Sequence, residues 1–227
     1  SNVVSPITTK QLVDQGSLVP LRVFIAKEVD MTGAKKVAGE WSQADATERG
    51  MKITGDIVDE WVKQTFRLFN KAVKTVVFCA GVAHGKDLER QFKERGFNFV
   101  SISYLEEDEF KREAIEEFSK PDSTIHGLIA TDILTRGFDV PDVGCVCDAR
   151  PLRKSLSTAI QMWGRGLRSS PDTGKKDCHL LDFSGNIIRF FEDFNDIYFN
   201  GLDALNDGDK LDKKVRTQEE FEKKGCP

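Results

Sequence analysis

The sequence predicts an α/β domain in which a mainly parallel sheet is covered by helices on both faces. Short apolar runs alternate with charged, amphipathic segments, and the apolar runs are nearly continuous. Such runs are typical of parallel strands that are buried on both faces. With 227 residues, 39% hydrophobic and 31% charged, the chain is long enough to bury a core and has the balance of a soluble globular protein.

The expected strands cover residues 75–80, 97–103, 127–131, 143–148 and 178–183, and the helices after them 85–95, 108–118, 155–163 and 185–198. The apolar spacing after Thr54, the expected N-cap, predicts an amphipathic helix to about residue 72. We expect a short helix at residues 8–16 and an extended segment at residues 18–26. The glycine-containing residues 27–50 predict a long, partly ordered connection.

Charge and cysteine content limit the classes of function. The net charge of −4 gives no sign of nucleic-acid binding by the chain as a whole, so any phosphate site must be a local patch. Four of the five cysteines lie in or beside apolar runs, which predicts buried, reduced thiols and a cytoplasmic protein. The sequence contains no signal peptide or membrane-length apolar run, so no membrane partner is expected.

The most informative segment is residues 161–168, which read QMWGRGLR. Arg165 and Arg168 are three residues apart at the end of a predicted helix and therefore point the same way. Their guanidinium groups suit the oxygens of a γ-phosphoryl group, and the flanking Gly164 permits a close backbone approach. The alternative is a solvated basic helix end.

Two further segments follow predicted strands. Thr131 lies at a strand tip, and Gly137 precedes Asp139 in the same segment. The strand through Phe78 delivers a small-residue turn at Gly81, whose N–H groups suit a phosphate. We expect all three segments at the carboxyl ends of strands, where open α/β sheets bind ligands. Taken alone, the Thr131 segment and the Phe78 segment are equally consistent with ordinary strand-to-helix connections.

In this order and spacing, the three segments resemble motifs IV, V and VI of superfamily-two helicases. The resemblance covers about residues 18–189 and looks closest to RadD-like DNA helicases. The segments that carry this closer likeness are residues 14–20 (DQGSLVP), 39–41 (GEW), 164–168 (GRGLR) and 177–186 (DCHLLDFSGN).

The resemblance implies a second RecA-like domain of an ATP-dependent DNA helicase or translocase with a role in DNA repair or recombination. It places Arg165 and Arg168 as arginine fingers on the γ-phosphate of ATP. Gln161 would sense the nucleotide beside Gly164, and Gly137 and Asp139 would lie near the ribose and triphosphate. The strand backbone would be held by Thr131, Gly81 and the turn after Phe78.

The sequence departs from a complete helicase motor. Residues 81–87 (GVAHGKD) imitate a Walker A loop, but the spacing is one residue short and Asp87 replaces Ser or Thr. ATP and Mg²⁺ are therefore expected on a missing N-terminal RecA-like domain, and the isolated chain is expected to be inactive. The expected domains are a junction at 1–50, the RecA-like domain at 51–200 and a charged tail at 201–227. Cys226 resembles the start of a truncated zinc knuckle, and no metal site is expected here.

The remaining candidates have structural interpretations. His84 is expected on a surface loop, and His126 and His179 are expected to be structural. Trp61 keeps the helical apolar spacing and belongs to the core, whereas Trp41 is left open between packing and base stacking. Two rival functions remain: a non-catalytic nucleic-acid-binding α/β module and a flavodoxin-like nucleotide-sensing domain.

Overall fold

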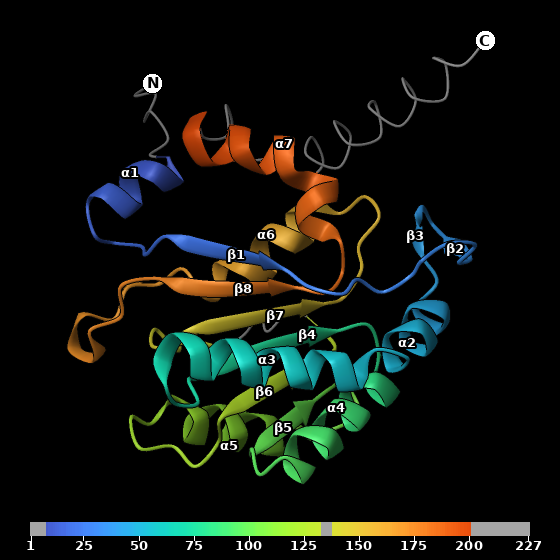
Figure 1. Ribbon diagram of the computed structural model, residues 1–227, viewed down its shortest axis with the longest axis horizontal. Helices are drawn as coiled ribbons and strands as arrows, with labels where there is room; N and C mark the ends of the chain where they lie inside the picture. Colours follow the sequence, from blue (N-terminus) through green and yellow to red (C-terminus); the bar gives the residue numbers. More distant parts are fainter. Residues whose placement is uncertain (1–7, 133–137, 201–227) are drawn as a thin grey trace.

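The computed structural model describes residues 8–132 and 138–200. They contain a six-stranded parallel sheet in the order β1-β8-β7-β4-β6-β5 (Figure 1). Its strands are β1 (Leu21–Ile25), β4 (Thr75–Cys79), β5 (Phe99–Ile102), β6 (Gly127–Ala130), β7 (Cys145–Ala149) and β8 (Cys178–Asp182). The helices are α1 (Thr9–Asp14), α2 (Gln43–Met51), α3 (Thr54–Phe69), α4 (Val82–Glu94), α5 (Asp108–Ser119), α6 (Leu156–Gly164) and α7 (Asn186–Asn200), with a short 3₁₀ turn at Pro171–Thr173.

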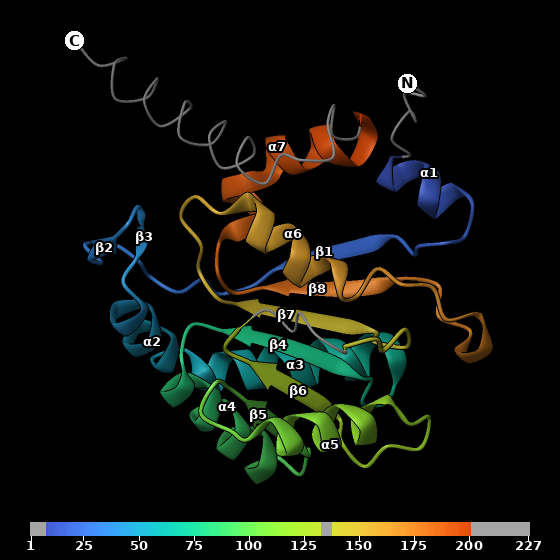
Figure 2. The ribbon, with the colours of Figure 1, turned by 180° about the vertical axis from the view of Figure 1, so that it is seen from behind.

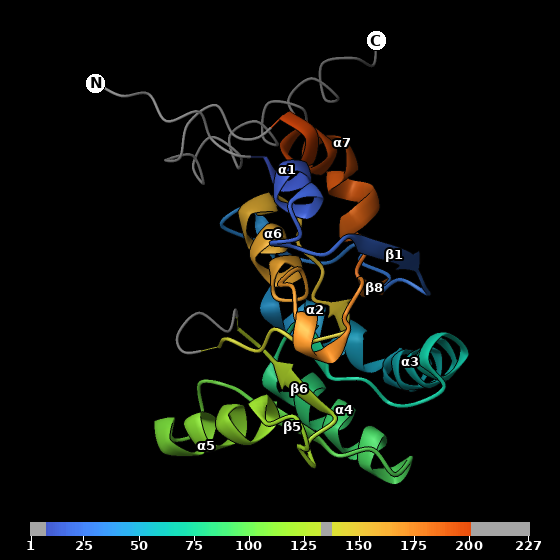
Figure 3. The same cartoon turned by 90° about the vertical axis from the view of Figure 1, so that its left-hand side faces the viewer.

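Two hydrophobic cores lie on the two faces of the sheet. In β4, Val76 and Phe78 enter one core while Val77 and Cys79 enter the other, because successive strand residues point to opposite faces. Side chains of α5, α6 and α7 fill the first core, and those of α2, α3 and α4 fill the second. Figures 2 and 3 show α5 and α6 on the face opposite α3. The predicted fold class is confirmed: this is a RecA-like sheet with helices on both faces.

The connection predicted at residues 27–50 contains more structure than its sequence indicates. It forms a small hairpin of β2 (Lys36–Val37) and β3 (Glu40–Trp41), followed by α2. The Glu40 carboxylate accepts backbone N–H groups of Arg153 at 2.6 Å and of Lys154 and Ser155 at 2.8 Å. These partners lie more than a hundred residues away, so local periodicity could not reveal the contact that orders the hairpin.

The first turn of α3 also differs from its prediction. Thr54 is the first helical residue, and the N-cap position belongs to Ile53, which makes no side-chain capping bond. The Thr54 hydroxyl instead donates to the carbonyl of Met51 at 3.2 Å. The prediction of Thr54 as the N-cap is therefore wrong by one residue, although the start of the helix is correct.

The two tryptophans in question both pack within the domain. Trp61 is fully buried, as predicted, and its indole N–H donates to the Thr75 hydroxyl at 2.8 Å. Buried indoles need such a partner. Trp41 is half-buried, with the guanidinium carbon of Arg189 4.5 Å from its ring centre. The structure thus gives Trp41 a packing role.

The amino-terminal segment joins the sheet. β1 pairs with β8 in parallel along its whole length, although it lies inside the segment predicted as a junction. α1 begins with a capping box between Thr8 and Gln11 and lies beside α7. None of the helices among the described residues is long and apolar enough to cross a membrane. The predicted tail at 201–227, with Cys226, lies outside the described residues.

Candidate functional site

The arginine segment lies at the amino edge of the sheet. α6 follows β7 and returns the chain towards the strand beginnings, as a crossover helix between parallel strands must. Beyond it, the N–H of Val19 donates to the Leu167 carbonyl at 2.8 Å, and Arg168 forms a bridge with Leu18, just before β1. The prediction that all three segments share the carboxyl edge is therefore wrong for the arginines.

Arg165 is the C-cap of α6, where a cation interacts favourably with the helix dipole. Its guanidinium lies 5.8 Å from the ring centre of Phe138 and donates weakly to that residue's carbonyl at 3.4 Å. Its Nε is buried and has no hydrogen-bond partner among the described residues. Burial, followed by the nearby charge of Arg168, lowers the pKa of Arg165 from its ordinary value. A buried donor without an acceptor costs free energy, so the Arg165 Nε has hydrogen-bonding capacity that the described residues do not use.

Arg168 meets the segment that follows β6. Its guanidinium forms an ion pair with the carboxylate of Asp139, and both side chains are substantially exposed, at 47% and 70%. Exposed pairs of this kind stabilise a fold by only about 0–1 kcal/mol. The pair can therefore exchange its carboxylate for another anion at little cost in stability. The structure thus brings together Arg165, Arg168 and Asp139.

The other predicted nucleotide-binding positions are distributed around this cluster. Gln161 is exposed on α6, one turn before the arginines, and Gly164 is the last helical residue. A methyl group added at Gly164 would meet no atom within 4 Å. Gly137 lies outside the described residues.

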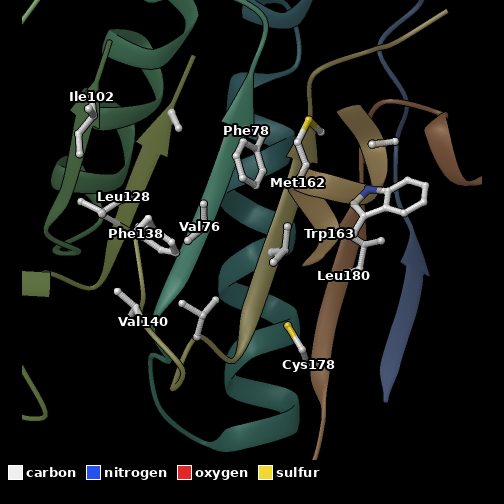
Figure 4. Close-up of a cluster of buried hydrophobic side chains, with 14 of the residues drawn as sticks. Val76, Phe78, Ile102, Leu128, Phe138, Val140, Met162, Trp163, Cys178 and Leu180 are labelled. Carbon is white, nitrogen blue, oxygen red and sulfur yellow. The ribbon is translucent and has the colours of Figure 1, made fainter. Parts of the chain in front are cut away.

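The predicted strand-binding positions lie at the opposite, carboxyl edge. The Phe78 side chain is buried in the core, as Figure 4 shows, so only the backbone beyond it is available. Gly81 is the N-cap of α4, and a Cβ there would lie 2.1 Å from the Thr47 hydroxyl. Thr131 is buried, with its hydroxyl unpartnered among the described residues and its carbonyl accepting Arg150 Nη1 at 3.0 Å. The two predicted functions of the domain thus occupy different edges of one sheet.

Sequence reasoning missed the buried carboxylate of Asp148, which holds α6 in place. Trp163, directly before Gly164, donates its indole N–H to Asp148 at 2.9 Å, and the Asn186 amide donates to the same oxygen at 2.9 Å. Burial, followed by the charge of Asp182, raises the pKa of Asp148 to about 7. The available signal was an aspartate within each of two buried strands, β7 and β8.

His84 is not on a surface loop, contrary to the prediction. It lies in the first turn of α4, fully buried, because α2 packs over it. A Cβ at Gly50 of α2 would lie 2.5 Å from the His84 ring. Both ring nitrogens are buried without partners among the described residues, and burial lowers the pKa of His84 to about 4. His126 and His179 have structural contacts instead, with the Asn98 N–H and the Asp177 carboxylate.

We expect His84 to make the domain acid-sensitive. Its pKa is about 4 when folded and 6.5 ordinarily, so between these values the unfolded chain binds the extra proton and stability falls as pH falls. The contribution of His84 to this loss between pH 7.5 and pH 5 should be about 2 kcal/mol. The raised pKa of Asp148 acts in the opposite direction, so the quantity to measure is the difference between wild type and His84→Leu in how the free energy of urea unfolding changes between the two pH values. An unchanged pH dependence in that variant would assign the acid sensitivity to another group.

The described residues contain no cluster of three or more His, Cys, Asp or Glu side chains that could hold a metal ion. The guanidinium groups of Arg165 and Arg168 at the amino edge are of a kind that can bind an anion. Thr131, Asp139, Arg165 and Arg168 all lie within the region that matches a known family.

Residues 58–170 match the family model described as the helicase conserved C-terminal domain. Residues 58–170 form a helicase C-terminal domain of superfamily two. The chain is also 30% identical over 161 residues to a Saccharomyces cerevisiae protein named as an ATP-dependent helicase, IRC3. That alignment covers 70% of this chain and 22% of that protein. The chain therefore spans only about a fifth of the length of this relative.

Solved structures support the fold of this helicase C-terminal domain. A fragment assigned to the HsdR subunit of a type I restriction enzyme from Vibrio vulnificus YJ016 matches with a TM-score of 0.65 and 22% identity, over 88% of this chain and 38% of that chain. Domain 2 of the DEAD-box helicase Mss116p, bound to an RNA duplex, matches with a TM-score of 0.52 and 16% identity, over 81% of this chain and 61% of that chain. At these identities the likeness concerns the fold alone.

Proposed function

We propose that this helicase C-terminal domain supplies two arginine fingers to ATP held on another RecA-like domain of the same protein. The protein would be an ATP-dependent DNA helicase or translocase. The observation that carries the proposal is the state of Arg165 and Arg168 among the described residues: one has a buried Nε without a partner there, and the other pairs with an exposed carboxylate. Guanidinium groups in this condition suit the terminal phosphate of a nucleotide.

The residues present fit part of a nucleotide site. Arg165 and Arg168 would bind the terminal phosphate oxygens, and Asp139 would leave Arg168 and turn to the ribose. Gln161 and Gly164 would border the phosphates, with Gly137. Mg²⁺, when bound, would neutralise phosphate charge, and its ligands would come from the other domain. Because the fingers arrive only when two domains close, hydrolysis is coupled to movement.

The carboxyl edge would hold one nucleic-acid strand by its backbone. Gly81 and the turn after Phe78 would offer backbone N–H donors, which grip phosphates without reading sequence. The Thr131 hydroxyl is buried and would join them only if the strand's approach uncovered it. We infer DNA as the strand, and a role in DNA repair or recombination, from the RadD-like segments. The described cysteines are buried free thiols, which fits the reducing cytoplasm.

A different class of function, a non-catalytic nucleic-acid-binding module, would use the same arginines on a strand. The separation of the two edges favours the motor, because the arginines and Thr131 do not lie together. A single strand-binding module would be expected to gather its phosphate contacts on one surface.

The proposal predicts that the 227-residue chain alone binds single-stranded DNA weakly, does not hydrolyse ATP and shows little preference for base sequence. The logarithm of the binding constant should fall linearly with the logarithm of the salt concentration, with a slope of about −0.7 for each phosphate contact. With few contacts, the total slope should be small. Fluorescence anisotropy at several salt concentrations measures the slope, and phosphate release measures hydrolysis. Tight, sequence-selective binding at physiological salt would favour the binding module. ATP hydrolysis by the chain alone that is lost in Arg165→Ala would contradict the proposal that ATP is held on another domain.

A further inference from the structure

A single lysine joins the two segments that carry the arginine cluster. Lys175, three residues before β8, donates from Nζ to the carbonyls of Pro141, Gly166 and Arg168, each at 2.8 Å. An ammonium group has three donors, so these bonds use all of them. Pro141 lies two residues after Asp139, while Gly166 and Arg168 enclose the turn after Arg165. The lysine thus ties the Asp139 segment to the arginine segment.

The environment of Lys175 differs from that of an ordinary surface lysine. The residue is half-buried, whereas its neighbour Lys176 is exposed. Burial lowers the pKa of Lys175 from its ordinary value. Removing an ammonium from water is unfavourable unless hydrogen bonds replace the lost hydration, and the carbonyl oxygens provide them. Two of those carbonyls follow the end of α6, where backbone acceptors lack helical partners.

The cluster has few other restraints of this kind. The Arg168–Asp139 pair is exposed and contributes little, and the Arg165 bond to the Phe138 carbonyl is long, at 3.4 Å. The bridge between Arg168 and Leu18 fixes only one side of the turn. Core packing of the buried Phe138 and Val140 also holds the segment of Asp139, and to this packing Lys175 adds three short hydrogen bonds that fix its backbone against that of Arg168.

We propose that Lys175 is a positioning residue for ATP hydrolysis, which holds Arg165 and Arg168 at the geometry that the terminal phosphate requires. The inference rests on the proposed function of the arginines and adds a residue that touches no substrate. Displacing a catalytic group by about 1 Å can lower a rate by about 10²-fold. Loss of the three Lys175 hydrogen bonds, which together act as a clamp on the two segments, is therefore expected to lower the rate of hydrolysis. A guanidinium cannot replace it, because its donors lie in one plane.

The test compares Lys175→Met with Lys176→Met in the full-length protein. Both remove one positive charge from adjacent positions, but only the first removes the clamp. We expect Lys175→Met to lower kcat by about 10- to 100-fold with a smaller change in the KM for ATP, and Lys176→Met to stay within about twofold of wild type. Lys175→Arg should rescue kcat poorly. Thermal unfolding of each variant sets an assay temperature at which all of them are folded.

A double-mutant cycle separates positioning from general stability. In an Arg165→Ala/Arg168→Ala background, Lys175→Met should lower kcat much less than in wild type, because both groups that it positions are gone. An equal fold-loss in both backgrounds, or normal kcat in Lys175→Met, would overturn the inference. Normal turnover in Arg168→Ala alone would instead overturn the proposed function. The two failures are therefore distinguishable.

Discussion

Replacing Arg168 with alanine in the full-length protein is expected to lower the kcat for ATP hydrolysis by as much as about 10³-fold, as for arginine fingers supplied in trans. The guanidinium would meet the phosphoryl oxygens only when the two domains close, so its charge acts mainly in the transition state. The affinity for ATP should change far less. Steady-state ATPase assays at saturating DNA measure kcat and KM together.

Three measurements test whether that loss comes from the missing guanidinium at the phosphate. Arg168→Lys should restore little activity, because an ammonium does not reproduce the planar fork. The thermal stability of Arg168→Ala should be nearly unchanged, because the ion pair with Asp139 is exposed. Its nucleotide-free DNA affinity should also be preserved, since Thr131 and Gly81 lie at the other edge. If DNA affinity collapses while DNA-saturated turnover stays normal, Arg168 belongs to the strand-binding surface and the proposed finger is wrong.

Most of the sheet could be predicted because its strands carry their own signal. Each of the five strands expected at 75–80, 97–103, 127–131, 143–148 and 178–183 is present, with ends displaced by at most two residues. β1 was visible only as an extended segment, since edge strands are half-solvated and β1 contains exposed Val23 and Ile25. α2 was not visible at all, because the contacts that order its surroundings come from Glu40 and a loop far along the chain.

The sequence indicated which residues belong to the candidate site, but not at which edge of the sheet they lie. The arginines were singled out by their spacing and Asp139 by the resemblance to superfamily-two helicases, yet the position of the arginines at the amino edge depends on how α6 returns the chain. Lys175 could not be found, because its partners are backbone carbonyls, which leave no pattern in a sequence. His84 was misplaced because a histidine after a small-residue turn resembles a loop residue until α2 is seen to cover it.

Gly164 and Gly166, on either side of Arg165, should differ in how much stability the domain loses when each is changed to alanine. A Cβ at Gly166 would lie 2.2 Å from the Cys178 sulfur and 3.0 Å from a methyl group of Val146, both of them buried strand residues. Overpacking of this kind costs about 1–3 kcal/mol. Gly166→Ala should therefore lower stability by about that amount, and the backbone shift that relieves the clash should displace Arg165 and Arg168.

Gly164→Ala serves as the matched control, because a Cβ there has open space within the domain. Its stability should be unchanged or up to about 1 kcal/mol higher than that of wild type, because Gly164 lies in α6 and alanine is favoured over glycine in a helix. Any loss of kcat in Gly164→Ala must then come from something outside this domain that approaches its backbone, which is the role proposed for this glycine beside the nucleotide. Urea unfolding of the domain and ATPase assays of the full-length protein measure the two effects separately. If Gly164→Ala is neutral in both assays, Gly164 does not face the nucleotide. If Gly166→Ala is fully stable and fully active, the arginine turn does not depend on its packing against β7 and β8.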